Sequence, residues 1–399
     1  MARSRLQLVF DLNALGLRTP TGAWNSSNAE AFLRYLQSKQ QAIYGFQLGN
    51  EPGHYLTAAG VPTVAEHAKD YFAFRSLLTS LDWNTGQGHP LLIGPDVCFT
   101  DGPMGPPPGG VGKCANITYF EQLLRMTNRT IDLVTVHSYG LTGAQPGNIG
   151  QCTLDDFLSP DLWEVRGKTT LQPWMAVTRA VYGPDAKLIL GETGTAGRGG
   201  CTNLSNTFAA GFFYVDQLGL AAALGYWQVF RQDLVGWSGE GTTSSYALAG
   251  DPGWGGATPL LPNPDFFTTR LWRRLVGPII LNASLVVDAG TGVRVHAACG
   301  TARKGEVLLS WINPTSVQQS LTLLAPLHAT PRDEYVLTAY NSELTSRNVC
   351  LNGATDFLTV ESPMPPRVVD TSADPSIRLP PHAYGFFVLT GAGIPVCNY

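Results

Sequence analysis

Charged side chains are scarce in this sequence, and neither sign dominates. Asp, Glu, Lys and Arg make up 14% of its 399 residues, against roughly 25% in an average globular protein. The 26 basic and 30 acidic residues leave a formal net charge of −4 at neutral pH. This composition excludes a charge-rich disordered chain and a coiled coil, and it lacks the basic excess of nucleic-acid-binding proteins.

The sequence also lacks an apolar run of the roughly 20 residues that a membrane-spanning helix needs. The best candidate, residues 208–227, is interrupted by Asp216 and Gln217, so we interpret it as an amphipathic helix. The first apolar segment, residues 6–10, ends at Asp11 before it reaches the length of a signal-peptide core. No signal peptide is therefore evident.

No two of the seven cysteines have the CxxC spacing of a zinc or redox site. Because seven is odd, at least one cysteine is unpaired or pairs elsewhere. Five Asn-x-Ser/Thr sequons begin at Asn25, Asn116, Asn128, Asn203 and Asn282. Cysteines and sequons together favour a secreted, extracellular or lysosomal protein with disulfide bonds and N-linked glycans.

Short apolar runs alternate with helical patterns through the first part of the chain, which is typical of parallel βα units. The expected strands are residues 6–10, 44–48, 91–93, 133–136, 188–190 and 225–230, and the expected helices are residues 28–38, 64–81, 119–126, 170–181, 207–224 and 265–275. Six such units are present, whereas a closed (β/α)8 barrel has eight.

From residue 277 onward the helical periodicity ends. Short strand-like segments follow at residues 284–287, 293–297, 306–312, 320–324, 335–340, 357–360 and 384–389. Such a series, split by turns, predicts an antiparallel β-sandwich. The expected domains are residues 1–276, of the α/β class, and residues 277–399, the sandwich.

Two carboxylates stand at the ends of expected strands. Glu51 lies in the segment LGNEP at residues 48–52, and Glu192 lies in LGET at residues 190–193. In parallel barrels the carboxyl ends of the strands point into the active site. Glycosidic cleavage requires two acids there, one to protonate the leaving oxygen and one to attack or to activate water. Helix caps or structural salt bridges are the alternative roles for such residues.

The sequence resembles the heparanase-type β-glucuronidases in order along the whole chain. The matching segments are residues 10–15 (FDLNAL), 24–29 (WNSSNA), 48–52 (LGNEP), 94–97 (GPDV), 136–139 (VHSY), 191–193 (GET), 207–212 (TFAAGF) and 384–388 (YGFFV). The resemblance implies a (β/α)8 barrel of which residues 6–10 form the third strand, so that the first two strands lack a counterpart here.

The resemblance also implies roles for the two acids and their neighbours. Glu51 matches the general acid/base and Glu192 the nucleophile of a retaining mechanism. Asn50 matches the residue that holds the 2-hydroxyl of the sugar. His137 and Tyr139 match substrate-site residues after the sixth barrel strand, where Tyr139 would orient Glu192. A buried core histidine and a packed aromatic are the alternative readings of these last two.

Three further residues match the part of the family's site that binds the glucuronate carboxylate. Tyr246 corresponds to a tyrosine that reaches this group, and Gly199 and Gly200 lie in a loop whose backbone N–H groups serve the same anion. Glycine-rich loops are often only turns, which is the alternative for the two glycines.

The implied chemistry is double displacement, with carboxyl groups roughly 5–5.5 Å apart. Burial and mutual repulsion would separate the two carboxyl pKa values, so that one acid begins protonated and the other ionised. No metal or organic cofactor is required.

The sequence departs from the family in two ways. The missing first two strands imply that a separate N-terminal chain supplies a βαβ unit, or that the gene product is partial. In addition, the basic cluster that follows GPDV in the family is replaced by residues 98–114, a Gly- and Pro-rich stretch with Lys113 as its one base. A sulfated polyanion would need a denser array, so we favour a less sulfated glucuronate-containing glycan as substrate.

The resemblance implies one disulfide, between Cys299 and Cys397. Proximity in the sequence or the expected fold suggests two more pairs, Cys98 with Cys114 and Cys152 with Cys201, and leaves Cys350 over. A set of buried free thiols is the alternative.

The leading hypothesis is a retaining β-glucuronidase that acts on a glucuronate-containing polysaccharide or proteoglycan. Its rivals are a non-catalytic relative that binds glycan or protein, and a hydrolase of the same clan with another sugar specificity.

Overall fold

The structure is a computed structural model. It describes residues 6–14, 18–51, 63–81, 83, 89–98, 117–141, 153–160, 162, 168–197, 199–236, 238–239, 242–243, 245–250, 261–283, 292–371 and 375–399. The chain packs as two compact units: one comprises Met1–Ser138, Thr170–Glu192 and Gly225–Phe230, and the other comprises Tyr139–Thr169, Thr193–Leu224 and Arg231–Tyr399. The division into residues 1–276 and 277–399 stays a prediction.

Six strands form one sheet in chain order. They are β1 (Val9–Leu12), β2 (Gly45–Leu48), β3 (Leu91–Cys98), β4 (Leu133–Leu141), β5 (Leu188–Ala196) and β6 (Gln228–Arg231). The pairings of β1 with β2, β2 with β3 and β3 with β4 are parallel. The α/β class is therefore confirmed, and the sheet supplies six of the eight strands of a barrel.

Helices separate these strands, as the sequence predicts. They are α1 (Ser27–Ser38), α2 (Val64–Ser80), α3 (Ile117–Thr127), α4 (Leu154–Leu158), α5 (Lys168–Tyr182), α6 (Ala210–Leu224) and α7 (Pro264–Leu275). The start of α2 shows the local cause: Thr63 and Glu66 form a reciprocal capping box that satisfies two backbone N–H groups. No helix among the described residues is long and apolar enough to cross a membrane.

The core of the first unit follows from the apolar runs. Ile93, Leu133 and Ile189, one each from β3, β4 and β5, form a buried cluster. Alternate residues of a strand point to opposite faces of the sheet, so neighbouring strands with aligned apolar runs fill the same layer. The buried strands thus hold their carboxyl ends, and the side chains that follow, in fixed positions.

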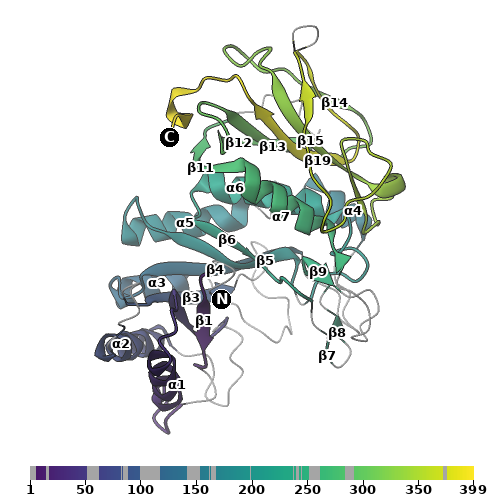
Figure 1. The fold of residues 1–399 in the computed structure, drawn as a ribbon. Helices are drawn as coiled ribbons and strands as arrows, with labels where there is room; N and C mark the ends of the chain where they lie inside the picture. Colours follow the sequence, from purple (N-terminus) through teal and green to yellow (C-terminus); the bar gives the residue numbers. More distant parts are fainter. Residues whose placement is uncertain are drawn as a thin grey trace. The chain divides into compact units, whose positions relative to one another are not determined.

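The C-terminal region is built on an antiparallel sheet of seven strands. These are β11 (Val276–Leu281), β12 (Arg294–Gly300), β13 (Val307–Asn313), β15 (Arg332–Ala339), β16 (Val349–Leu351), β17 (Arg367–Val369) and β19 (Ala383–Leu389). A two-stranded sheet of β14 (Gln319–Leu321) and β18 (Ile377–Leu379) accompanies it. Figure 1 shows α6 beside β12 and β13 of this region, with α7 next to α6.

The strand β13 shows how both faces of the larger sheet are buried. Val307, Leu309 and Trp311 pack in a cluster with residues of β14 and β18. Leu308 and Ile312 pack instead with the apolar side chains of α6 and α7. A strand buried on both faces is apolar at almost every position, and this explains its unbroken run in the sequence. The predicted sandwich is confirmed, with helices on its second face.

The helix α6 is buried around most of its circumference, unlike the amphipathic helix that we expected. A Cβ at Gly211 would lie 2.1 Å from the hydroxyl oxygen of Tyr384, and one at Gly219 would lie 2.2 Å from the ring of His296. These glycines therefore permit close packing of the helix on the sheet. Asp216, the interrupting charge, is buried against Arg294 and His296 of β12.

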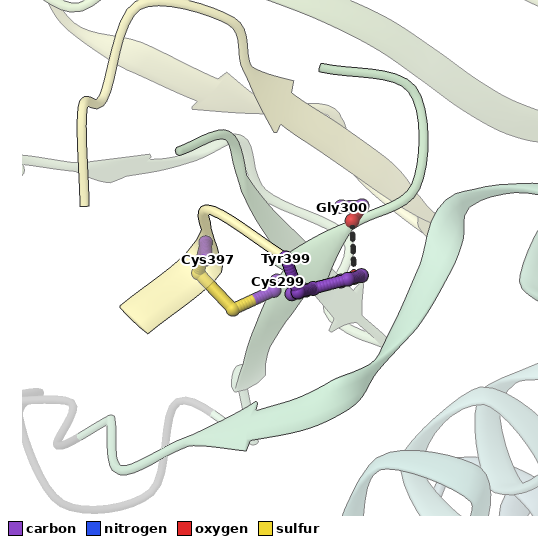
Figure 2. The surroundings of a disulfide bond; sticks show 4 residues. All are labelled: Cys299, Gly300, Cys397 and Tyr399. Carbon is purple, nitrogen blue, oxygen red and sulfur yellow. Dashed lines mark hydrogen bonds between the residues drawn. A yellow bond between two sulfur atoms is a disulfide. The ribbon is translucent and has the colours of Figure 1, made fainter. Parts of the chain in front are cut away.

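The predicted disulfide between Cys299 and Cys397 is confirmed, and it joins residues 98 positions apart. It fastens the short helix η4 (Pro395–Cys397) to β12, and the Tyr399 hydroxyl donates a hydrogen bond of 2.6 Å to the carbonyl of Gly300 (Figure 2). Cys350 is a buried free thiol. Cys201 is disulfide-bonded, whereas Cys152, Cys114 and the side chain of Cys98 lie outside the described residues.

The expected strand at residues 357–360 is wrong, because these residues form no strand. The Thr359 N–H donates to the Ser362 hydroxyl at 2.8 Å instead of joining a ladder. The strands β11, β16, β17 and β18 of this region were not expected. The expected strand at residues 284–287 lies outside the described residues. The remaining elements are β7 (Ser238–Gly239), β8 (Thr242–Thr243), β9 (Ala249–Gly250), β10 (Leu261–Pro262) and η3 (Tyr340–Ser342).

Candidate active site

Glu51 follows the end of β2 in an unusual backbone conformation. Its φ is +47°, directly after Gly49 at +76° and the exposed Asn50. Left-handed φ is rare for a residue with a side chain, and strained residues of this kind cluster at functional sites. A hydrogen bond of 3.1 Å from the Glu51 N–H to the carbonyl of Asp96 stabilises this conformation.

Glu192 lies within β5 and follows Gly191. A Cβ at position 191 would lie 2.1 Å from Oγ1 of Thr135 and 3.2 Å from Oδ1 of Asp96. Only glycine fits there without displacing the neighbouring strands, which explains the Gly-Glu pair in the sequence. The side chains of Glu51 and Glu192 are 13% and 22% exposed, so both carboxylates are accessible but largely enclosed.

A buried histidine joins the two acids. Nδ1 of His137, on β4, lies 2.9 Å from Oε1 of Glu51 and 3.7 Å from Oε2 of Glu192. One carboxylate oxygen of each glutamate and one ring nitrogen of His137 all lie within 4.8 Å of one another. The structure therefore brings together the two predicted acids and His137, from three different strands of one sheet.

The other side of His137 contacts Asp96. Its Nε2 lies 2.8 Å from Oδ1 of Asp96, and the Thr135 hydroxyl donates to the same oxygen at 3.0 Å. Asp96 is a buried residue of β3 with a φ of +57°, so it shares the left-handed conformation of Glu51. Asp96 belongs to the segment GPDV, for which no role was predicted from the sequence. Its position at the end of an apolar run was the available signal.

Electrostatics favour a charged imidazole at this position. Burial alone would lower the pKa of His137, but the charge and hydrogen bond of Asp96, the hydrogen bond of Glu51 and the charge of Glu192 raise it well above its ordinary value. Three carboxylates thus surround one cation, which reduces their mutual repulsion.

Asp11, at the carboxyl-terminal part of β1, adds a fourth carboxylate, which was not among the predicted site residues. Burial of the carboxyl and the charge of Asp96 raise its pKa, while a backbone hydrogen bond from Gly49 and the charge of His137 lower it. The residue as a whole is exposed, so water screens part of this effect.

The second unit holds the other predicted site residues. Tyr139 and Tyr246 stack with ring centroids 5.9 Å apart. Gly199 and Gly200 have φ values of +85° and +87°, and the Gly199 carbonyl accepts a hydrogen bond of 2.6 Å from the Ser245 N–H. The N–H of Gly200 donates to the carbonyl of Gly197 at 3.1 Å, so binding an anion there would require it to exchange or share this bond.

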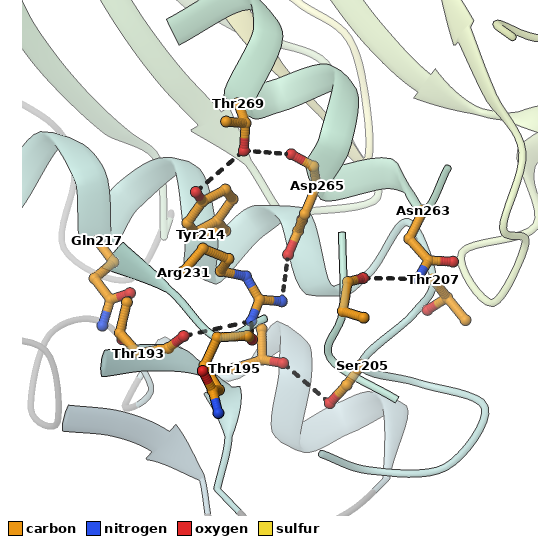
Figure 3. Close-up of polar contacts among 12 residues, drawn as sticks. Thr193, Thr195, Ser205, Thr207, Tyr214, Gln217, Arg231, Asn263, Asp265 and Thr269 are labelled. Atoms are coloured by element: carbon orange, nitrogen blue, oxygen red, sulfur yellow. Dashed lines mark hydrogen bonds and ion pairs between the residues drawn. The ribbon is translucent and has the colours of Figure 1, made fainter. Parts of the chain in front are cut away.

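A buried ion pair lies behind these tyrosines. Arg231, at the end of β6, pairs with Asp265 at 2.9 Å, and its guanidinium carbon lies 5.9 Å from the ring centroid of Tyr246. Figure 3 shows Arg231 between Asp265 and the carbonyl of Thr193. Both terminal nitrogens of its guanidinium donate to these acceptors or to the carbonyl of Gln232, so the charge of Arg231 is paired with Asp265.

Glu51, His137 and Glu192 also have the donor types of a metal site. The two ring nitrogens of His137 are each within 2.9 Å of a carboxylate oxygen, an arrangement that suits two N–H donors. A metal ligand must instead offer a lone pair from a neutral ring. A metal ion at this cluster would therefore compete with the charged form of His137.

The described sequon asparagines, Asn25, Asn128, Asn203 and Asn282, are all exposed, as attachment of a glycan requires. Asn116 lies outside the described residues.

Comparison with known proteins identifies the family. The model of the glycosyl hydrolase family 79 N-terminal domain matches residues 1–219. Heparanase of Rattus norvegicus is 33% identical over 402 residues, covering 99% of this chain and 68% of the relative. The chain belongs to glycosyl hydrolase family 79.

More distant relatives include an enzyme and an inactive protein. Baicalin-β-D-glucuronidase of Scutellaria baicalensis is 27% identical, with 94% of this chain and 64% of the relative covered. Inactive heparanase-2 of Homo sapiens is 28% identical, with 99% and 63% covered. A crystal structure of a 4-O-α-L-rhamnosyl-β-D-glucuronidase from Fusarium oxysporum matches the fold with a TM-score of 0.63 and 17% identity, covering 97% of this chain and 77% of that one.

These findings confirm the resemblance, the fold class and the expected enzyme class, a glucuronidase-type glycoside hydrolase that acts on a glycan. The roles of individual residues stay predictions.

Proposed function

We propose that this chain hydrolyses β-D-glucuronides with retention of configuration, with Glu192 as nucleophile and Glu51 as general acid/base. The observation that carries the proposal is the approach of the two carboxylates, one just after β2 and one within β5, to within 4.8 Å. Retaining enzymes hold their carboxyl groups roughly 5–5.5 Å apart, whereas inverting enzymes leave about 6.5–9.5 Å for a water molecule.

In this mechanism Glu192 attacks the anomeric carbon while Glu51 protonates the departing oxygen. The bond to the aglycone breaks and an ester to Glu192 forms. Glu51 then takes a proton from water, which attacks the anomeric carbon and releases Glu192. Asn50 would hold the 2-hydroxyl group, and Tyr139 would orient Glu192.

The glucuronate carboxylate would be recognised by Tyr246 and by the loop of Gly199 and Gly200. Both glycines have positive φ, a conformation that disfavours a side chain. Both are buried, so a ligand would reach this backbone only after the Gly200 N–H exchanges its bond to Gly197. The low charge of the chain supports a weakly sulfated glucuronate-containing polysaccharide or proteoglycan as the natural substrate.

A βαβ segment pairing with β1 would complete an eight-stranded barrel, whether it belongs to a separate chain or to the same polypeptide. β1 is a terminal strand of the described six-stranded sheet, so its outer edge is the position for such a segment. The cysteine bridge and exposed sequons support a secreted or lysosomal location.

The test is release of the aglycone from an aryl β-glucuronide at mildly acidic pH. Glu192→Gln should lower the rate by about 10³-fold or more, since it removes the group that forms the covalent intermediate. Glu121→Gln, the same chemical change on the exposed face of α3, should leave the rate unchanged. Equal activity in Glu192→Gln and in the unmodified chain would refute the assigned nucleophile.

The second candidate, a non-catalytic binder, is favoured by the similarity to inactive heparanase-2. Retention of Glu51, His137 and Glu192 within one cluster argues against it, because a binding protein has no need of the paired acids. A folded chain that binds a glucuronide but does not turn it over, with the βαβ segment present, would support the binder.

A further inference from the structure

The cluster contains more than the two acids that the reaction needs. His137 is 2% exposed and contacts both Glu51 and Asp96, and Asp96 also accepts a hydrogen bond from Thr135. A buried histidine between two carboxylates is held in one orientation and has no access to bulk water. Such an arrangement can control the hydrogen bonding of Glu51, the proposed acid/base.

We propose that Asp96 and His137 are a positioning pair that keeps Oε1 of Glu51 as a hydrogen-bond acceptor, so that the proton used in the reaction resides on Oε2. The inference rests on the proposed role of Glu51. Neither Asp96 nor His137 exchanges a proton with the substrate.

The geometry supports this division of the two oxygens. The distances of 2.8 Å from Nε2 to Asp96 and 2.9 Å from Nδ1 to Glu51 suit a doubly protonated ring. In that form both nitrogens of His137 are donors. Oε1 of Glu51 then accepts throughout the cycle. The proton on Oε2 passes to the leaving oxygen, and the proton taken from water returns to Oε2.

A neutral imidazole would act in the opposite way. With a single proton on Nε2, held by Asp96, Nδ1 would be an acceptor and would draw the Glu51 proton to Oε1. That proton would point away from the leaving group. The charge of His137 therefore decides which oxygen of Glu51 carries the proton.

The surrounding charges explain how the cation persists in a buried place. Four carboxylates face it: Asp11 from β1, Glu51 after β2, Asp96 from β3 and Glu192 from β5. When Glu192 becomes an ester it loses its charge, but Asp96 remains. The sheet thus retains one buried anion for His137 in every intermediate.

The first measurement requires no activity. Nitrogen-15 spectra of the histidine rings, recorded from pH 5 to pH 8, should show one histidine with both nitrogens protonated at pH 8. This signal should persist in His296→Gln, because His296 contacts a different carboxylate, Asp216. It should shift to the neutral form in Asp96→Asn. A wild-type spectrum in which every histidine is neutral at pH 8 would overturn the proposal.

The second measurement is the pH profile of kcat/KM for an aryl β-glucuronide. In Asp96→Asn, deprotonation of His137 enters the working range, so the basic limb should move to lower pH by about one unit or more. Asp70→Asn, which removes an equally buried aspartate paired with Arg18, should keep the wild-type profile.

A decrease of the same factor at every pH in Asp96→Asn would indicate a merely structural role and would contradict the proposal. The two measurements also separate this inference from the proposed function. If His137 is doubly protonated but the protein has no glucuronidase activity, the proposed function is wrong, whereas the charged state of His137 is supported.

Discussion

At the scale of single residues, the account depends on backbone conformations that most residues avoid. Glu51 and Asp96 both have positive φ, and the N–H of the first donates to the carbonyl of the second. Each such residue costs on the order of 1–3 kcal/mol, so the surrounding sheet must hold it. These two strained acids, joined by a backbone hydrogen bond, therefore lower the stability of the fold at the proposed active site.

Tyr246 provides a test of substrate recognition at this scale. If its hydroxyl binds the glucuronate carboxylate, Tyr246→Phe should slow glucuronide hydrolysis by about 10-fold or more, since a hydrogen bond to a charged group contributes about 1.5–3 kcal/mol. Hydrolysis of the matching aryl β-glucoside should change little. The ratio of the two kcat/KM values is the measurement, and an unchanged ratio would show that Tyr246 does not read the carboxylate.

The sequence was sufficient for some of these residues and not for others. Glu51 and Glu192 stand at the ends of apolar runs, and their contact follows from the parallel order of the strands. Asp96 was missed because its partner His137 is 41 positions away. No local pattern reports such a contact. The Gly200 N–H was expected to bind an anion, but in the structure it donates to the carbonyl of Gly197. A glycine-rich sequence does not reveal such a turn in advance.

At the scale of elements, apolar runs predicted the six strands of the parallel sheet. The pattern is clearest in β4 and β5, which are buried on both faces along most of their length. The antiparallel region was harder to predict. Residues 357–360 are apolar enough for a strand, yet the side chain of Ser362 takes the backbone N–H of Thr359. Conversely, β18 has three residues and is defined by its partner β14 rather than by its own composition.

The disulfide between η4 and β12 gives a prediction for one element. Cys397→Ser opens a loop of 98 residues, and it should lower the free energy of unfolding by about 2–4 kcal/mol because the unfolded chain gains freedom. Urea unfolding of the two proteins is the measurement. Cys350→Ser, at a buried free thiol, is the control for thiol loss alone. Equal midpoints for Cys397→Ser and the wild type would refute the stabilising role.

His67 in α2 gives a prediction for stability against pH. Its ring is buried, Nδ1 lies 3.0 Å from the Tyr119 hydroxyl oxygen, and burial and the charge of Arg18 lower its pKa to about 3. The unfolded chain binds a proton below its pKa of about 6.5 while the folded chain does not, so stability falls as pH falls between these values, by up to about 1.4 kcal/mol per pH unit.

Replacement of this histidine should therefore flatten the acid side of the stability curve. His67→Gln should lose less stability between pH 6.5 and pH 4.5 than the wild type, whatever its stability at neutral pH. Urea unfolding at the two pH values measures this difference. His89→Gln, at an exposed position, should follow the wild type. An unchanged slope in His67→Gln would mean that His67 is not the responsible group.

At the scale of the whole molecule, charge is the property that bears on the substrate. A chain with a net charge of −4 and only 26 basic residues has little to attract a sulfated polyanion. We expect kcat/KM to be higher for unsulfated than for densely sulfated glucuronate polysaccharide, and to change less than about threefold between 50 and 200 mM salt. A preference for the sulfated chain, lost at high salt, would contradict this expectation.

The central claim is that Glu192 forms a covalent bond to glucuronate. The most direct measurement is to incubate the protein, with its βαβ segment present, with a 2-deoxy-2-fluoro-β-glucuronyl fluoride and to locate the adduct by peptide mass spectrometry. We expect one 2-deoxy-2-fluoroglucuronyl group on the peptide that contains Glu192, with loss of the anomeric fluoride, and none in Glu192→Gln. An adduct on another residue, or rapid turnover with release of the inverted sugar and no adduct, would contradict it.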